Sequence, residues 1–401
     1  MELLKNKLSM TLVRIISFHL AKQLDALISA QAKNAHSSPI LPLDQDAFCS
    51  KISDQLETLE LKQRAEFIAD EIYQALPKDL TLRYQVIRGM LHTRTHANQK
   101  VSQQSDENGL CGWAMMCLGP IVAKYGLSDF DKSLCLLKDM TAYFSCEFDI
   151  RPFIIKDQNK ALSIISSWVN EKDYHVRRLV SEGTRPRLPW AMKIPALIQD
   201  PSPMVPLLTM LRDDNEEYVR RSVANHLNDI AKDHPELVAS IAHEWLNDKG
   251  IEADKTKRIN RFKLVKHACR TLIKQGHTQT LNAFGIKPAK IALESLKVLD
   301  NKVELGKDLY FELTLGSTSN VKQSLIIDYI LHHKKANGTL IPKIFKWKSI
   351  DIDASQTIRI EKKHSFKLIT TRKYYPGEHA ISVRINGEDY GYTEFDLVSS
   401  I

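Results

Sequence analysis

The stretch Tyr174-His175-Val176-Arg177-Arg178-Leu179 recurs in this chain as Glu217-Tyr218-Val219-Arg220-Arg221-Ser222, with a fainter copy at Lys263-Leu264-Val265-Lys266-His267-Ala268. The central valines of the three copies are 43 and 46 residues apart. This period is typical of HEAT and armadillo repeats, whose helix pairs bury their apolar faces by stacking on one another. The repeat therefore predicts an α-solenoid.

Each copy of the repeat carries a basic pair at the same phase, and two interpretations of these pairs stay open. In the first, they line one side of the superhelix as a concave basic track for a polyanion. In the second, they cap or bridge neighbouring helices. The chain has 401 residues and a formal net charge of +8, which favours the first interpretation because a cation excess attracts polyanions.

Helical periodicity extends the solenoid on both sides of the repeat. The expected helices cover residues 1–32, 45–58, 60–76, 80–90, 111–124, 129–145, 156–170, 174–182, 190–198, 204–211, 216–233 and 235–247. The polar or Pro-containing segments 33–44 and 92–108 are predicted to be loops.

After Gly276 the pattern changes from helical spacing to alternation, as in Tyr310-Phe311-Glu312-Leu313-Thr314-Leu315. Turn signals follow at Asn337-Gly338, Pro376-Gly377 and Asn386-Gly387. Short strands over about 100 residues predict an immunoglobulin-like β-sandwich without its disulfide. The predicted division is a HEAT-like α-solenoid over residues 1–284 and a sandwich over residues 285–401.

The six cysteines show neither CxxC pairs nor zinc-finger spacing, which indicates reduced thiols in a cytoplasmic protein. No segment reaches membrane-spanning length. The sequence also lacks a phosphate-binding Gly loop, a dinucleotide fingerprint, an HExxH motif and a nucleophile elbow. We therefore expect no metal and no organic cofactor. Cys146 has no placed base, and a small buried thiol is its better interpretation.

Residues 144–153 and 175–190 combine carboxylates, arginines and aromatic residues within apolar sequence. Charged groups in such a setting are either structural ion pairs or a positively lined groove with carboxylates at its floor.

Three motifs carry a resemblance to a known family: the run 144–153, the run 175–190, and Tyr218-Val219-Arg220-Arg221-Ser222-Val223-Ala224-Asn225-His226-Leu227-Asn228-Asp229-Ile230-Ala231-Lys232. On these, residues 1 to about 280 resemble the AlkC branch of the AlkC/AlkD HEAT-like DNA glycosylases. The sandwich, with Thr370-Thr371-Arg372-Lys373-Tyr374-Tyr375-Pro376-Gly377, resembles the C-terminal immunoglobulin-like domain of many AlkC members.

The resemblance implies excision of cationic N-alkylated bases, chiefly 3-methylcytosine and 3-methyladenine, from duplex DNA in base excision repair, without flipping the base into a pocket. An alkylated ring nitrogen already makes the base a good leaving group. The enzyme then has to stabilise an electron-deficient sugar, which a carboxylate does electrostatically and an aromatic face does by cation–π contact. We expect a monofunctional hydrolase, because no lysine is placed for a Schiff base.

By resemblance, the catalytic residues are Glu147, Glu182 and Trp190. Each has a structural alternative. Glu147 could pair with Arg151, and Glu182 could pair with Arg178, in both cases one helical turn away. Trp190 could simply anchor its loop.

The candidate DNA-binding residues are basic and mostly arginines: Arg151, Arg177, Arg178, Arg185, Arg187, Arg220, Arg221, Lys232 and Lys373. The polar residues Asn225, Asn228 and Asp229 either contact DNA or bond between repeats. The basic clusters of the sandwich (Lys343, Lys346, Lys348, Lys362, Lys363, Lys367, Arg372 and Lys373) either close around DNA or are solvated strand faces. The expected partner is double-stranded DNA. We expect the protein to act as a monomer and not to bind a membrane. A HEAT scaffold that binds DNA or protein without catalysis is the rival interpretation.

Overall fold

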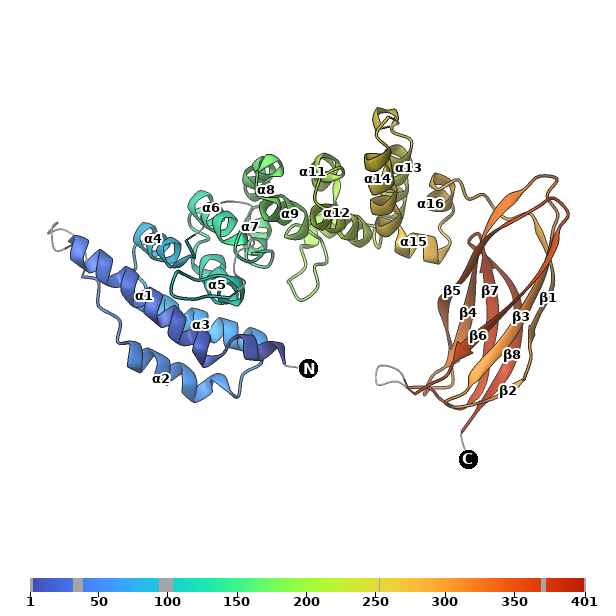
Figure 1. Cartoon of the computed structure of the whole chain (residues 1–401), viewed down its shortest axis with the longest axis horizontal. Helices are drawn as coiled ribbons and strands as arrows, with labels where there is room; N and C mark the ends of the chain where they lie inside the picture. Colours follow the sequence, from blue (N-terminus) through green and yellow to red (C-terminus); the bar gives the residue numbers. More distant parts are fainter. Residues whose placement is uncertain (1–2, 32–38, 94–103, 252, 369–372, 400–401) are drawn as a thin grey trace. The chain divides into compact units, whose positions relative to one another are not determined.

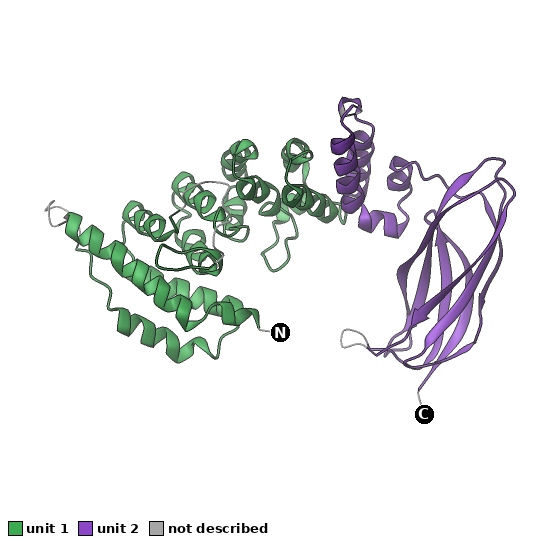
Figure 2. Ribbon diagram, viewed as in Figure 1, with its two compact units in different colours: residues 1–233 green, residues 234–401 purple. Residues whose placement is uncertain are grey.

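The computed structural model describes residues 3–31, 39–93, 104–251, 253–368 and 373–399. It divides into two compact units, Met1–Asp233 and His234–Ile401 (Figure 2). Thr370, Thr371, Arg372 and parts of the predicted loops 33–44 and 92–108 (residues 33–38 and 94–103) lie outside the described residues. No helix in the described ranges is long and apolar enough to cross a membrane.

The first unit is helical throughout (Figure 1). Its α-helices are α1 (Met10–Gln31), α2 (Gln45–Leu56), α3 (Leu61–Ala75), α4 (Leu80–Met90), α5 (Met115–Tyr125), α6 (Phe130–Thr141), α7 (Arg151–Lys156), α8 (Gln158–Ser166), α9 (Tyr174–Glu182), α10 (Pro195–Gln199), α11 (Val205–Leu211) and α12 (Glu217–Ile230). A 3₁₀ turn at Leu4–Lys7 precedes α1, and further short 3₁₀ turns lie at Gly112–Ala114, Ser167–Asn170 and Ser202–Met204.

Aspartates begin many of these helices. The carboxylates of Asp44, Asp79, Asp129, Asp157 and Asp173 each accept a hydrogen bond from a backbone N–H in the first turn of α2, α4, α6, α8 and α9. Such a cap stabilises a helix by about 1 kcal/mol. The frequent caps explain how short helices with short connections remain ordered.

Neighbouring helices pack as the repeat predicts. Helix α6 packs on α8 and α9, α9 packs on α12, and α11 contacts both α9 and α12. Val176 in α9 and Val219 in α12 are both buried, so the repeated valine faces the core in each copy. The HEAT-like α-solenoid is confirmed.

The helix predicted at 190–198 is wrong at its start. Residues 190–194 are not helical, and α10 begins only at Pro195. Trp190 has a φ of 66°, a left-handed conformation that a helix excludes. Pro195 suits the first turn of a helix, where a missing N–H costs no hydrogen bond.

The second unit begins with helices α13 (Pro235–Leu246), α14 (Lys255–Ala268), α15 (Arg270–Gln275) and α16 (Thr278–Ala283), with a 3₁₀ turn at Lys249–Ile251. Its strands are β1 (Ile291–Val298), β2 (Lys302–Glu304), β3 (Asp308–Ser317), β4 (Gln323–Lys334), β5 (Leu340–Ile352), β6 (Thr357–Ser365), β7 (Gly377–Ile385) and β8 (Glu388–Val398). Val265 of the third repeat copy is buried in α14.

The strands form a three-stranded sheet in the order β1-β3-β6 and a five-stranded sheet in the order β2-β8-β7-β4-β5. The two sheets share one hydrophobic core, in which Phe311, Phe366 and Ile381 are fully buried. The immunoglobulin-like sandwich is confirmed. The second compact unit contains the helices α13–α16 together with the sandwich. The change from helix to strand falls between Ala283 and Ile291.

Within this unit, the hairpin turn between β7 and β8 meets the end of α15. A Cβ added to Gly387 would lie 2.6 Å from the Gly276 carbonyl oxygen, so the two backbones touch. Arg384 donates to the carbonyl of Gln275 at 3.0 Å. This contact between the β7–β8 turn and the end of α15 is called the joint below. It needs glycine at positions 276 and 387, since both residues have a positive φ and no room for a side chain.

Candidate active site

The first candidate carboxylate, Glu147, lies in a tight turn between α6 and α7. Cys146 anchors this turn, because it is buried and its N–H donates to the Thr141 hydroxyl at 3.2 Å. The N–H groups of Asp149 and Ile150 both donate to the Cys146 carbonyl. The turn therefore holds Glu147 on a fixed backbone, and Cys146 has the structural part expected of it.

Glu147 pairs with Arg178 of α9 rather than with Arg151. The Arg178 Nη1 to Glu147 Oε2 distance is 2.6 Å, and the Ser145 hydroxyl donates to the same oxygen at 2.8 Å. Arg151 is the first residue of α7. The one-turn spacing that suggested its pairing with Glu147 therefore does not lie on a helix.

The second candidate carboxylate, Glu182, is buried at the end of α9 and shares the same guanidinium. Its Oε1 is 3.6 Å from Arg178 Nη2 and 2.6 Å from Arg185 Nη1, and Ser222 donates to its Oε2 at 2.6 Å. Arg178 thus joins the two carboxylates that the resemblance singled out.

The Arg178 guanidinium also lies 4.4 Å from the centre of the Tyr218 ring. Burial opposes its charge, but Glu147 and Glu182 outweigh burial, so the pKa of Arg178 is raised. Burial likewise raises the pKa of the Tyr218 hydroxyl. The ion pair is therefore partly desolvated, and removing one partner of such a pair is costly.

The network continues along α12. Arg185 donates to Asp229 at 2.8 Å, and the Lys232 ammonium lies 3.0 Å from the other oxygen of Asp229. Arg187 makes a bidentate pair with Asp233 at 3.0 and 2.9 Å. Arg185 is buried, whereas the side chains of Arg187 and Lys232 are 27% and 45% exposed, which leaves only the last two with surface for a phosphate.

Arg151 is fully buried, and its guanidinium is bound to main-chain carbonyls. It donates to Met192 O at 2.7 Å, to Gly183 O at 2.9 Å and to Arg185 O at 2.8 Å. Burial, reinforced by Arg185, lowers the pKa of Arg151 to about 10, so it remains charged at neutral pH. This arrangement makes Arg151 the organiser of the loop 183–192.

Trp190 stands on this loop with 64% of its surface exposed and with a φ of 66°. Lys62 of α3 donates to the Trp190 carbonyl, and the Lys62 ammonium lies 5.7 Å from the centre of the Phe148 ring. The backbone of Trp190 is thus held while its indole is presented to solvent.

The first arginine of the repeated pair has the same structural part in both copies. Arg177 donates to the carbonyls of Glu171 and Lys172, and Arg220 donates to those of Asp214 and Asn215. Each arginine ties down the turn five and six residues before it. Arg221, the second of its pair, is exposed on α12.

Sequence reasoning missed Asp149, which is half-buried two residues after Glu147. Burial, reinforced by the charge of Glu147, raises the pKa of Asp149 to about 7. Its carboxyl packs on Gly119 of α5, where an added Cβ would lie 2.2 Å from Oδ2. The only signal in the sequence was a second acidic residue in the run 144–153.

Three comparisons place the chain among known proteins. It is 37% identical over 340 residues to "Uncharacterized protein YhaZ" of Bacillus subtilis (strain 168), covering 84% of this chain and 88% of that protein. It also matches the solved structure of Pseudomonas fluorescens alkylpurine DNA glycosylase AlkC bound to DNA containing an abasic site analog, at 31% identity and a TM-score of 0.77 over 99% of this chain and 100% of that one. The chain belongs to the AlkC family. Residues 292–399 match the family model of the YhaZ C-terminal Ig-like domain.

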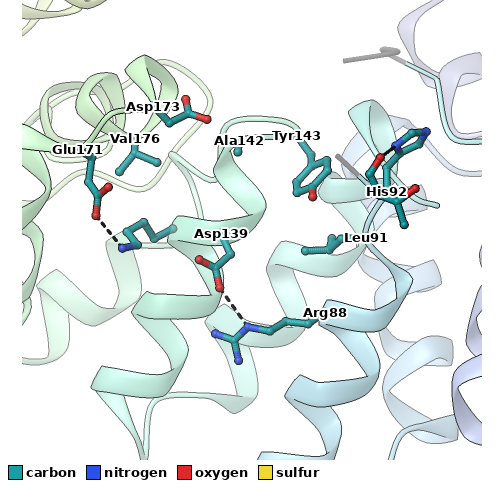
Figure 3. Close-up of a pocket in the computed structure, with 11 residues that line it drawn as sticks. Arg88, Leu91, His92, Asp139, Ala142, Tyr143, Glu171, Asp173 and Val176 are labelled. Atoms are coloured by element: carbon teal, nitrogen blue, oxygen red, sulfur yellow. Dashed lines mark hydrogen bonds and ion pairs between the residues drawn. The ribbon is translucent and has the colours of Figure 1, made fainter. Parts of the chain in front are cut away.

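A separate hollow of about 550 Å³ lies in the first unit of this AlkC-family chain (Figure 3). Its charged side chains are already paired, Arg88 with Asp139 at 3.0 Å and Lys138 with Glu171 at 2.8 Å. Neither Glu147 nor Glu182 lines it. The carboxylate cluster is therefore not part of this hollow.

The basic residues of the sandwich belong to the second unit. The Lys363 ammonium lies 2.8 Å from Asp308, and those of Lys343 and Lys373 lie 5.6 and 5.3 Å from the ring centres of Phe345 and Tyr375. Across the described ranges, no group of three or more His, Cys, Asp or Glu residues could hold a metal ion.

Proposed function

We propose that this protein is a DNA glycosylase that hydrolyses the N-glycosidic bond of cationic N-alkylated bases, 3-methylcytosine and 3-methyladenine, in duplex DNA. Two lines of support are its membership of the AlkC family and the 31% identity with an alkylpurine DNA glycosylase over the whole of that chain. The observation that carries the proposal is that Glu147 and Glu182 converge on the single guanidinium of Arg178.

The proposed chemistry needs negative charge beside C1′ of the sugar. The cationic base leaves with the glycosidic electron pair, and the sugar becomes oxocarbenium-like. Glu147 and Glu182 stabilise that charge, because preorganised carboxylates in a partly desolvated site act more strongly than in water. Water then adds to C1′ and loses its proton, so the product is an abasic sugar and the reaction needs no lysine intermediate.

Arg178 is a positioning residue in this scheme. It fixes both carboxylates and the face of Tyr218 within one contact set. The exposed indole of Trp190 supplies an aromatic face for the cationic base or sugar. An exposed aromatic and a carboxylate cluster outside the hollow of Figure 3 agree with chemistry on a base that is not flipped into a pocket.

Duplex DNA is the proposed partner. Arg187, Arg221 and Lys232 are not buried and are the phosphate-contact candidates that we favour in the first unit, and Lys373 is exposed in the second. We propose that residues 1–284 carry binding and catalysis and that residues 285–401 form an accessory DNA-engaging domain. We also propose that the protein acts as a cytoplasmic monomer.

The test is base release from a duplex oligonucleotide with a single 3-methylcytosine or 3-methyladenine, by the full-length wild type and by Glu147→Gln. Amide replacement keeps the shape of the side chain and removes its charge. We expect release by the wild type and a fall of at least about 100-fold in the variant, the size typical of losing one preorganised electrostatic group. Strand breakage without added alkali or endonuclease would contradict a monofunctional enzyme.

A second candidate function is DNA or protein binding without catalysis. The observation that favours it is that both carboxylates are already ion-paired with arginines, as structural carboxylates are. It predicts no base release by the wild type. Steeply salt-dependent DNA binding would then identify a DNA-binding solenoid, and its absence a protein scaffold.

A further inference from the structure

The charged groups around Glu147 and Glu182 include one more cation than carboxylate. Four cations stand in or beside the cluster: Arg151, Arg178, Arg185 and Lys232. They face three carboxylates, Glu147, Glu182 and Asp229. Four minus three leaves one positive charge, which is unfavourable for a site that has to stabilise a cationic base and a cationic sugar.

Asp149 is placed to supply the negative charge that offsets this excess cation. It lies on the same rigid turn as Glu147, and the Cys146 carbonyl accepts its N–H at 3.1 Å. The contact with Gly119 of α5 fixes the carboxyl from the other side, since a Cβ at that position would meet Oδ2 at 2.2 Å and Oδ1 at 2.9 Å. Both the backbone and the head group are thus held.

The groups around Asp149 favour its protonated form. Glu147 faces it from the same turn, and the buried Cys146 thiol beside it has a pKa well above its ordinary value because of burial. Gly119 of α5 brings no charge, and the Lys62 ammonium of α3 lies against the ring of Phe148. Arg178 is bound to Glu147. Burial and the neighbouring negative charge therefore both raise the pKa of Asp149.

We propose that Asp149 is a third carboxyl of the reaction centre, which adds a negative charge beside Glu147 when it is ionised and withdraws it when it is protonated. The inference rests on the proposed glycosylase function and assigns a group that controls it. Asp149 acts through the electrostatic field on the reacting sugar and base, so it is a positioning residue.

The expected signature is a pH profile. Because the pKa of Asp149 is raised to about 7, the single-turnover rate of the wild type should rise as pH increases through that value and then level off. Asp149→Asn keeps the shape of the side chain but cannot ionise. Its rate should stay at the low-pH level at every pH, about tenfold below the wild-type plateau, the size of one pKa unit of charge coupling.

Two further variants separate charge from structure. Gly119→Ala removes no ionisable group but forces the Asp149 carboxyl to move, and alanine itself favours helix. It should shift the midpoint of the pH profile. Asp131→Asn removes an exposed carboxylate from the first turn of α6, at the opposite end of that helix from the turn of Glu147. It should leave rate and profile unchanged.

The experiment measures base release from a 3-methylcytosine duplex by full-length protein between about pH 5.5 and pH 8, with thermal melting of each variant alongside. A flat profile for Asp149→Asn with wild-type thermal stability supports the proposal. A profile that still rises in Asp149→Asn, or a uniform loss that follows a loss of stability, overturns it while the glycosylase function stands. No release by the wild type at any pH overturns both.

Discussion

Replacing Arg151 by methionine tests whether this arginine organises the site from inside or contacts DNA. The side chain is fully buried and donates three hydrogen bonds, of 2.7, 2.9 and 2.8 Å, to carbonyls of the loop 183–192. Hydrogen bonds from a charged group contribute about 1.5–3 kcal/mol each, and they are not additive. Breaking such a buried set costs about 3–5 kcal/mol, and we expect Arg151→Met to lower the free energy of unfolding by that amount.

The matched control is Arg187→Met on the same loop. Arg187 pairs with Asp233 where both side chains are about a third exposed, and a surface ion pair contributes about 1 kcal/mol or less. Urea denaturation followed by helical circular dichroism measures both variants. A phosphate contact also raises the dependence of DNA affinity on salt, by about 0.9 in the slope of log K against log salt. We expect that slope to fall in Arg187→Met and to stay unchanged in Arg151→Met.

Base release adds a third readout. Since Arg151 holds the loop that carries Trp190, the rate of Arg151→Met should fall even at temperatures where the variant is fully folded. Arg151→Lys, which keeps the charge but cannot reach three carbonyls with one planar group, should restore little of that rate. A variant that lost less than about 1 kcal/mol and showed a reduced salt slope would refute the reasoning and make Arg151 a DNA contact.

Two further predictions concern stability. Burial lowers the pKa of His226 to about 4, so the unfolded chain binds the proton first. The stability that the neutral His226 imidazole contributes is fully present above the unfolded pKa of about 6.5. As the pH drops from there toward 4, the free energy of unfolding falls by up to about 3 kcal/mol. Urea denaturation at a series of pH values should show a flatter dependence of stability on pH for His226→Gln. Gly387→Ala should destabilise the joint with Gly276 by more than about 1 kcal/mol, which urea denaturation would detect and limited proteolysis between α15 and β1 would locate; an unchanged digest would show that the contact does not hold the joint.

The fold was predictable because its determinants are local and periodic. The repeated Val-Arg-Arg unit placed α9 and α12 in equivalent positions, and both valines are buried. The alternation of apolar and polar residues and the Asn-Gly turns predicted the sandwich. Asn386 and Gly387 take the positive φ values that a tight hairpin requires. Three predicted helices begin later than expected. The helix expected at 1–32 begins at Met10, the helix expected at 111–124 begins at Met115, and the helix expected at 190–198 begins at Pro195, where a Pro-broken loop overrode periodicity.

The site was less predictable because its contacts span long stretches of sequence. Spacing suggested Arg151 as the partner of Glu147, but no helix joins them, and the actual partner is 31 residues away. The carbonyls that Arg151 binds are 32 to 41 residues away. The influence of Gly119 on Asp149 depends on α5 packing beside the turn. Such relations follow from packing, and spacing along the chain does not encode them.

The two copies of the basic pair show how a repeat becomes a site. Arg177 and Arg220 tie down the turn before their helix in the same way, so the first arginine belongs to the fold. The second differs: Arg178 is drawn into a cluster because the turn of Glu147 lies against α9, while Arg221 is exposed on α12. At α9, Glu147 and Glu182 both pair with the second arginine, which we propose makes Arg178 a positioning residue. The proposed chemistry therefore belongs at α9, where this arginine meets both candidate carboxylates.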